Sequence, residues 1–380
     1  MAWMKIAALL ASLWLCAGPA KAESTIESKH AAEAGVPLLQ NFSPLDYGAA
    51  PQNWAVTQDR RGVIYVGNSD DGVLEYDGTR WRRIPVPNQS SVRSLAVDAN
   101  GRVYVGCIGE FGYLEPDVHG RMHYVSLLDR IAPAYRNFAD VWRIFVTDDG
   151  VYFGTVAQLF RLRGEHMDVW TATTSFDYFF KVRDRFYVRA EGRGLMEVIG
   201  DQLKMVKGGA RFAHERIHAL VAWGDETDHD GPLLVGTRER GWLVLDKGRL
   251  AAWPNETNKI LRDDQLYDAQ WLANGTLAVG TLQGGVLLVD RMGHLLERLR
   301  RNEGLINDTV LSMFQDREHG LWLALDNGLS RLDVASPLTL FSRNSGLDGT
   351  VLAMRRFQGR LYVGTTKGLF LLHSGVDGNA

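Results

Sequence analysis

Short stretches of alternating hydrophobic and polar residues, separated by turn residues, recur along almost the whole chain. One example is residues 92–97, Val-Arg-Ser-Leu-Ala-Val, which are followed by the turn Asp98-Ala99-Asn100-Gly101. In such a turn the Asp side chain caps the backbone, and the Gly supplies the positive φ angle that a tight hairpin requires. Alternation with a period of two predicts β-strands. No segment beyond the N-terminal apolar run keeps a helical period, so the pattern predicts an all-β protein.

A strand that ends in a hydrophobic pair followed by Gly reveals an internal repeat. Clear copies are Tyr65-Val66-Gly67, Tyr104-Val105-Gly106, Tyr152-Phe153-Gly154, Leu234-Val235-Gly236, Ala278-Val279-Gly280 and Tyr362-Val363-Gly364. Degenerate copies are Tyr187-Val188-Arg189 and Trp322-Leu323-Ala324. The copies follow one another at intervals of roughly 35–50 residues, close to the length of a four-stranded propeller blade. Because one blade cannot bury both of its faces, such blades pack side by side around an axis.

The repeat therefore predicts a β-propeller of seven or eight four-stranded antiparallel blades, which start near residues 53, 92, 141, 176, 217, 266, 310 and 351. The last unit ends without a fourth strand, and residues 38–42, Leu-Leu-Gln-Asn-Phe, resemble an unpaired outer strand. We expect this N-terminal strand to complete the last unit and to close an eight-bladed ring. The alternative is a seven-bladed ring in which the unit at residue 351 begins a second propeller.

The first 22 residues have the features of a signal peptide. Lys5 provides the positive charge, residues 6–15 are mostly apolar, and Ala20-Lys21-Ala22 forms an A-x-A cleavage site before Glu23. We therefore divide the chain into a signal peptide (1–22), an N-terminal linker (23–36) and a propeller domain (37–380), and we expect a periplasmic location. After cleavage Cys107 is the remaining cysteine, so no internal disulfide can form.

Charge and motifs exclude several classes of function. The formal net charge is −3 and no long basic run occurs, so nothing predicts binding to nucleic acid. The segment His214-Glu215-Arg216-Ile217-His218 matches the H-E-x-x-H signature of zinc proteases, which needs a helix to bring both imidazoles to one metal. The repeat places residues 217–221 on a strand, where residues four apart are separated by ~13 Å. We therefore predict no metal site, and we also predict no cofactor and no catalytic residues.

The repeats resemble those of a known family. Residues 307–316, Asn-Asp-Thr-Val-Leu-Ser-Met-Phe-Gln-Asp, are followed by Gly320-Leu321-Trp322-Leu323-Ala324 and Gly328-Leu329-Ser330-Arg331-Leu332. This succession resembles the two-component regulator propeller repeat. The resemblance implies a periplasmic sensor region of a bacterial hybrid histidine kinase or diguanylate cyclase. In that family a transmembrane helix and an output domain usually follow, whereas neither is found in residues 23–380. Two explanations stay open: the sequence is a truncated form of a longer receptor, or the protein acts through a separate output partner.

These features lead us to predict a periplasmic ligand-sensing propeller of a signal-transduction receptor, of the two-component or cyclic-di-GMP type, and not an enzyme. Two alternatives stay open: a protein-interaction scaffold without a small-molecule ligand, and a propeller enzyme such as a lyase or glycosidase. Glycosidases use a pair of neighbouring carboxylates. Among the positions that begin the innermost strands, only Asp177 is acidic, which counts against that chemistry.

Candidate ligand-binding residues are those that begin each innermost strand, because they line one mouth of a propeller. This position in successive blades, together with two neighbouring residues, gives Trp54, Arg93, Arg136, Trp142, Asp177, Tyr178, His218 and Tyr267. Aromatic faces beside Arg and Asp suit a sugar or a carboxylated ligand. The expected partners are a small molecule, with a saccharide as one candidate, and a membrane-bound signalling output domain.

Overall fold

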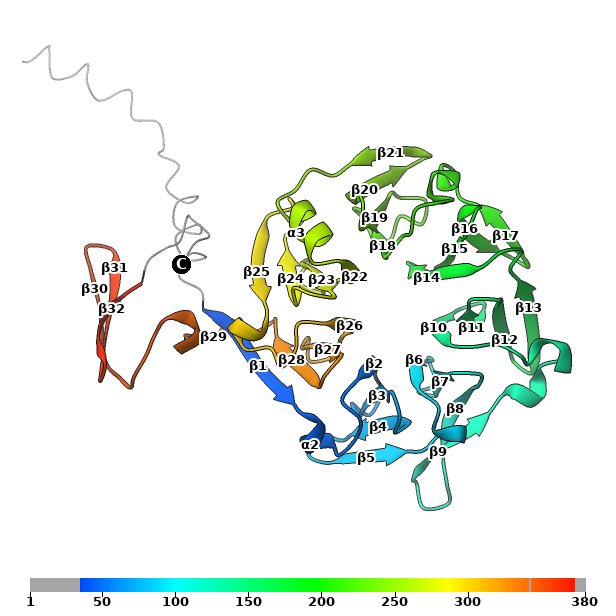
Figure 1. Cartoon of the computed structure of the whole chain (residues 1–380), viewed down its shortest axis with the longest axis horizontal. Helices are drawn as coiled ribbons and strands as arrows, with labels where there is room; N and C mark the ends of the chain where they lie inside the picture. The colour runs from blue at the N-terminus through cyan, green and yellow to red at the C-terminus, as the bar shows by residue number, and fades with distance from the viewer. Residues whose placement is uncertain (1–34, 342, 373–380) are drawn as a thin grey trace, which may run out of the picture. The chain divides into compact units, whose positions relative to one another are not determined.

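The structure, a computed structural model, describes residues 35–341 and 343–372, which fall into two compact units. The larger unit, residues 37–338, is a ring of antiparallel sheets around a central axis (Figure 1), so the predicted all-β propeller is confirmed. The predicted signal peptide (1–22) and residues 23–34 of the predicted linker lie outside the described residues. No helix in the described part of the chain is long and apolar enough to cross a membrane.

Six blades are each built from four strands that follow one another in the chain. The bounds are β2 (Asn53–Gln58), β3 (Ile64–Asn68), β4 (Val73–Tyr76) and β5 (Trp81–Ile84) in blade 1; β6 (Val92–Val97), β7 (Val103–Cys107), β8 (Phe111–Pro116) and β9 (Met122–Ser126) in blade 2; β10 (Val141–Thr147), β11 (Gly150–Thr155), β12 (Gln158–Arg163) and β13 (His166–Thr171) in blade 3; β14 (Phe176–Val182), β15 (Arg185–Ala190), β16 (Gly194–Ile199) and β17 (Gln202–Met205) in blade 4; β18 (Ala219–Ala222), β19 (Leu233–Thr237), β20 (Gly241–Asp246) and β21 (Arg249–Ala252) in blade 5; β22 (Leu266–Trp271), β23 (Leu277–Thr281), β24 (Val286–Val289) and β25 (Leu295–Leu299) in blade 6. The first strand of each blade is the innermost one (Figure 1).

Short helices lie in the connections between strands. They are α2 (Pro44–Tyr47), α3 (Thr257–Asp263) and the 3₁₀ turns η1 (Pro87–Gln89), η2 (Leu128–Arg130), η3 (Pro133–Tyr135), η4 (Gly209–Phe212) and η5 (Arg301–Glu303). Apart from α2, which leads from the N-terminal strand into blade 1, they follow the outer strands.

Blade 7 is completed by the N-terminal strand. It contains β26 (Val310–Gln315), β27 (Leu321–Leu325), β28 (Leu329–Asp333) and β1 (Val36–Phe42), which pairs with β28. The two strands are antiparallel, with Leu39 opposite Leu332 and Phe42 opposite Leu329. The Phe42 ring is buried and stacks on Trp322 at a centroid separation of 5.5 Å. The first strand of the chain thus closes the ring without a covalent bond.

The expectation that the N-terminal strand completes the unit at residue 351 is wrong, because β1 pairs with β28 instead. The ring therefore has seven blades. The chain that follows β28 forms only the two-residue strand β29 (Thr339–Leu340), so blade 7 has no long outer strand from that segment. The unit at 351 forms a three-stranded sheet in the second compact unit, which also holds η6 (Arg343–Ser345); its strands are β30 (Val351–Phe357), β31 (Arg360–Thr365) and β32 (Gly368–Leu371). The propeller accordingly ends near residue 338 and not at 380.

The Gly of the repeat lies where neighbouring blades approach closely. A Cβ atom added to Gly67 would lie 2.7 Å from the carbonyl oxygen of Val92 in blade 2, which is too close for any side chain. In blade 4 the equivalent residue is Arg189, whose side chain is fully buried. It donates hydrogen bonds to the backbone carbonyls of Phe212 (3.1 Å) and Ala213 (2.8 Å). The junction between blades 4 and 5 is therefore built around a charged side chain.

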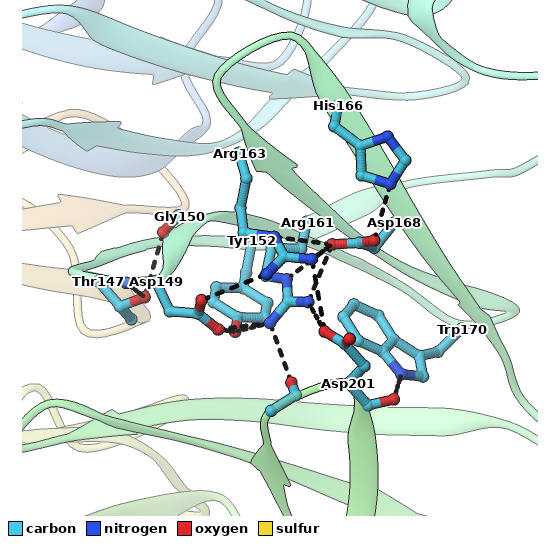
Figure 2. Close-up of polar contacts among 11 residues, drawn as sticks. Thr147, Asp149, Gly150, Tyr152, Arg161, Arg163, His166, Asp168, Trp170 and Asp201 are labelled. Atoms are coloured by element: carbon cyan, nitrogen blue, oxygen red, sulfur yellow. Dashed lines mark hydrogen bonds and ion pairs between the residues drawn. The ribbon is translucent and has the colours of Figure 1, made fainter.

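A second buried arginine joins blades 3 and 4 (Figure 2). Arg161 of β12 forms ion pairs with Asp149 and Asp168 of blade 3 and with Asp201 in the turn between β16 and β17 of blade 4. Its guanidinium carbon lies 4.9 Å from the centre of the Trp170 ring, and the Trp170 Nε1 donates to the Asp201 carbonyl over 3.0 Å. Because these charges pair with one another, we interpret the cluster as a joint between blades.

Candidate functional site

A cavity of about 700 Å³ lies along the axis of the ring. Its wall is formed by residues from the first strands of all seven blades. Each of these strands is hydrogen-bonded to a neighbour on only one edge, so its other edge borders the axis. The cavity is lined by Trp54, Arg93, Trp142, Asp177, Tyr178, His218 and Tyr267, which are all of the predicted candidates except Arg136.

β-Bulges explain why these side chains reach the cavity. The pairing between the first and second strands shifts register at the predicted positions Trp54, Arg93, Trp142, Asp177 and Tyr267. A bulge leaves the extra residue unpaired and re-aims its side chain. Because the bulge recurs at the same place in the repeat, one blade after another presents a side chain to the same cavity.

Between blades 1 and 3, an arginine lies against two indole rings. The guanidinium carbon of Arg93 is 4.1 Å from the centre of the Trp54 ring and 5.2 Å from that of Trp142. The Arg93 Nε donates to the Asp140 carboxylate over 2.7 Å, and the Trp54 Nε1 donates to the Ser69 hydroxyl over 3.0 Å. The Asp140 carboxylate therefore balances the charge of Arg93, and the two indole rings that contact the guanidinium fix its plane.

Blades 4 and 5 contribute a carboxylate, a phenol and an imidazole. The Asp177 carboxylate accepts a hydrogen bond from the Ser175 hydroxyl (2.9 Å) and forms an ion pair with Arg189. The rings of Tyr178 and His218 pack edge to face with their centroids 5.0 Å apart. His218 is buried, and its Nδ1 has no hydrogen-bond partner among the described residues.

The imidazole of His218 is neutral at physiological pH. Burial, followed by the positive charges of Arg238 and Arg216, lowers the pKa of His218 from 6.5 to about 3. A neutral imidazole carries one N–H donor and one acceptor nitrogen. The side chain can therefore bind a polar group, although it carries no charge itself.

The H-E-x-x-H segment is neither a helix nor one continuous strand. His214 lies in an exposed bend, and Glu215 pairs with Arg240 of the next loop. The strand predicted to start at residue 217 begins at Ala219, although the His218 N–H already donates to the Gly236 carbonyl of β19 over 2.9 Å. In the described residues no group of three His, Cys, Asp or Glu side chains is arranged to hold a metal ion.

Arg136 is the candidate that does not line the cavity. It follows η3 in the connection between blades 2 and 3, and its Nε donates to the Ile131 carbonyl over 2.8 Å. A weaker contact joins its Nη1 to Asp129 at 3.3 Å. The side chain therefore stabilises its own loop.

Four charged residues of the cavity wall were not among the eight candidates: Arg143, Lys181, Arg216 and Asp268. Asp268 accepts hydrogen bonds from the backbone N–H groups of Ala269 (3.0 Å) and Met313 (3.2 Å). Burial raises the pKa of Asp268, although the charge of Arg143 acts in the opposite direction. Arg143 and Asp268 each directly follow a bulge residue. A prediction that included the residue after each bulge would therefore have identified both.

No protein-family model and no curated protein matches the sequence. Among solved structures, the extracellular domain of the hybrid two-component system BT4673 from B. thetaiotaomicron has a TM-score of 0.59 at 19% identity. The corresponding domain of BT3049 from the same organism has a TM-score of 0.63 at 16% identity. The chain has the propeller fold of these extracellular domains. The resemblance to sensor propellers predicted from the repeats is thus confirmed at the level of the fold.

The two similar domains are much longer than this chain. The matches cover 88% of this chain but 45% of the BT4673 domain and 48% of the BT3049 domain. Virginiamycin B lyase from Staphylococcus aureus has a TM-score of 0.57 at 11% identity, and that match covers 78% of this chain and 98% of the lyase. The same architecture therefore occurs both in sensor domains and in an enzyme, and the site must decide between functions.

Proposed function

We propose that this protein is the ligand-sensing propeller of a signal-transduction receptor and that it binds a small molecule in the cavity on its axis. The observation that carries the proposal is the convergence of bulge residues from successive blades on one cavity. A volume of about 700 Å³ lies within the range of ordinary small-molecule sites. The buried Nδ1 of His218, which has no partner in the part of the chain that the structure describes, adds a polar group that a ligand can satisfy.

The fold suggests the biological setting. Propellers of this fold occur in extracellular domains of hybrid two-component systems. On that basis we propose a periplasmic location after removal of residues 1–22 and a membrane-bound output domain as partner. A saccharide is our first candidate ligand, because the half-buried rings of Trp142 and Tyr267 offer apolar faces beside hydrogen-bonding groups.

We also propose that the site binds without catalysis. The carboxylates on the cavity wall are Asp177 and Asp268. Asp177 is paired with Arg189, and Asp268 accepts two backbone hydrogen bonds. Neither is arranged as one half of an acid–base pair of the kind that hydrolyses glycosides.

Tryptophan fluorescence titrations with neutral and acidic saccharides test the proposal. We expect Trp142→Ala to weaken binding at least tenfold, because it removes a wall of the cavity. Trp81→Ala, which changes a half-buried indole on the outer strand of blade 1, is the matched control and leaves the Kd unchanged. Recovery of unaltered ligand by chromatography checks that no reaction occurs. Absence of any saccharide binding, together with binding of a protein partner, would favour the interaction scaffold instead.

A further inference from the structure

The part of the cavity mouth formed by blades 4 to 6 contains several hydrogen-bond donors without partners. The hydroxyls of Tyr178 and Tyr267, the imidazole of His218 and the guanidinium of Arg216 have no side-chain hydrogen bond or ion pair to any described residue. Arg238 uses only its Nε, which donates to the Leu266 carbonyl over 3.0 Å. Its two terminal nitrogens stay available.

These groups lie close enough to interact electrostatically. The rings of Tyr178 and His218 are in contact, with centroids 5.0 Å apart. The charges of Arg238 and Arg216 both act on His218 and on Tyr178, and Tyr267 acts on Tyr178 as well. Tyr178, His218, Tyr267 and Arg216 therefore lie on the cavity wall, and Arg238, which does not line the cavity, lies near enough for its charge to act on His218 and Tyr178.

The nearby carboxylates do not neutralise these arginines. Asp177 is occupied by Arg189 and by the Ser175 hydroxyl. Other arginines near this mouth do have acidic partners, since Arg93 pairs with Asp140 and Arg240 with Glu215. Arg216 and Arg238 have none in the described part of the chain. Among the described residues, this part of the site thus combines two arginines that have no acidic partner with neutral donors, and the carboxylates of the cavity wall, Asp177 and Asp268, are already hydrogen-bonded.

We propose that this cluster binds an anionic oxygen group of the ligand, a carboxylate, sulfate or phosphate, through Arg216 and Arg238, with Tyr178, Tyr267 and His218 as neutral donors. Such a group has several acceptor oxygens, and guanidinium groups bind it with charge-assisted hydrogen bonds. Arg189 acts as a positioning residue, because it holds the Asp177 carboxylate in an ion pair and so prevents it from pairing with Arg216 or Arg238. The inference rests on the proposed function and specifies the class of ligand.

Isothermal titration calorimetry with sodium acetate, sulfate and phosphate tests the inference directly, with sodium chloride holding the ionic strength constant. We expect at least one oxyanion to bind wild-type protein in a one-to-one ratio. Arg216→Gln or Arg238→Gln should weaken that binding about tenfold or more, as expected for loss of a charge-assisted hydrogen bond. Arg238→Lys, which keeps the charge, should retain part of the affinity. The anion that binds most tightly, acetate, sulfate or phosphate, identifies the kind of anionic group.

Arg193→Gln is the matched control, because Arg193 is exposed in the loop at the same end of blade 4, but its charge is not among those that act on His218 or Tyr178. Circular dichroism melting checks that each variant is folded. The inference is overturned if no oxyanion binds better than chloride, or if Arg193→Gln weakens binding as much as Arg238→Gln. A neutral saccharide that binds wild type and Arg238→Gln equally would overturn the anion site and leave the proposed sensing function standing. Oxyanion binding that is lost in both Arg216→Gln and Arg238→Gln, without any saccharide binding, would support the anion site and count against the saccharide ligand.

Discussion

Arg93 lies against Trp54, with its guanidinium carbon 4.1 Å from the centre of the indole ring. Arg93 is the second residue of β6 in blade 2 and Trp54 is the second residue of β2 in blade 1, so the contact joins neighbouring blades at the mouth of the cavity. The Asp140 carboxylate, which precedes blade 3, fixes the other edge of the guanidinium through a hydrogen bond of 2.7 Å. One side chain thereby connects three blades.

We expect Arg93→Lys to destabilise the propeller by about 1 kcal/mol, because a lysine keeps the charge but loses the planar contact with Trp54. Urea unfolding followed by circular dichroism measures the change. Arg80→Lys, at an exposed turn of blade 1, should change the free energy of unfolding by less than about 0.5 kcal/mol. Equal stability of Arg93→Lys and wild type would show that the stacking contributes nothing.

Phe42→Ala should destabilise the closed ring by about 3–5 kcal/mol, the usual cost of removing a buried aromatic side chain. The ring of Phe42 stacks on Trp322 and meets Trp81 edge to face, with both centroid separations at 5.5 Å. Leu45→Ala is the control, since Leu45 lies three residues further along but is 94% exposed. Thermal melting compares the two. A Phe42→Ala protein as stable as Leu45→Ala would mean that β1 does not close the ring.

Arg161→Met should destabilise the protein by about 1–3 kcal/mol at pH 7, because it removes three ion pairs and the contact with Trp170 and leaves the mostly buried Asp168 with the half-exposed Arg163. Arg163→Met, on the same strand and beside the same carboxylates but 40% exposed, should cost under about 1 kcal/mol.

Burial of Asp168 acts to raise its pKa, but the hydrogen bond and charge of Arg161 outweigh this and hold the pKa below 3.8. Asp168 therefore stabilises the fold above pH 3.8, and this contribution is lost as the pH falls through its folded-state pKa. The difference between Arg161→Met and wild type should shrink over that range in urea titrations at successive pH values.

His218 should make the propeller less stable in mild acid. Its pKa is lowered to about 3 in the folded protein from 6.5 when exposed, so between these values the unfolded chain binds a proton that the folded chain does not. The free energy of unfolding should then fall by at most about 1.4 kcal/mol per pH unit as the pH drops below 6.5. His218→Gln should remove this slope, whereas His214→Gln, at a side chain 87% exposed, should keep it. Identical slopes for the two variants would contradict the assignment of this pH dependence to His218.

Most of the cavity residues could be predicted from the sequence, because each occupies the same place within its repeat. The bulge residue lies ten or eleven positions before the aromatic residue of the repeat strand, so Trp54, Arg93 and Trp142 could be identified from position alone. Arg136 was included because of its closeness in sequence to blade 3, but its loop folds back onto Ile131. Asp268 was not predicted, although it directly follows the bulge residue Tyr267.

Ring closure could not be decided from the sequence, because it depends on pairing between segments that are far apart in the chain. The apolar alternation of residues 38–42 fits the open edge of β28 as well as that of β32, and local pattern does not choose between two distant edges. The conformation of the segment before β18 likewise involves Arg189, which binds carbonyls more than twenty positions away. Both features depend on long-range contacts that no repeat unit contains.

The pairing of β1 with β28 also sets an order of events during synthesis. Asn41 and Ser330, which share a hydrogen bond, are 289 positions apart. At ~5–20 residues per second, β1 waits for roughly 15–60 s after it is made before its partner exists. The same order holds if the chain folds after export, because blades 1 to 6 alone can form only an open arc whose first and last sheets expose apolar faces. A chain truncated before Leu329 has no partner for β1 and cannot close, which is the kind of species that chaperones and proteases intercept.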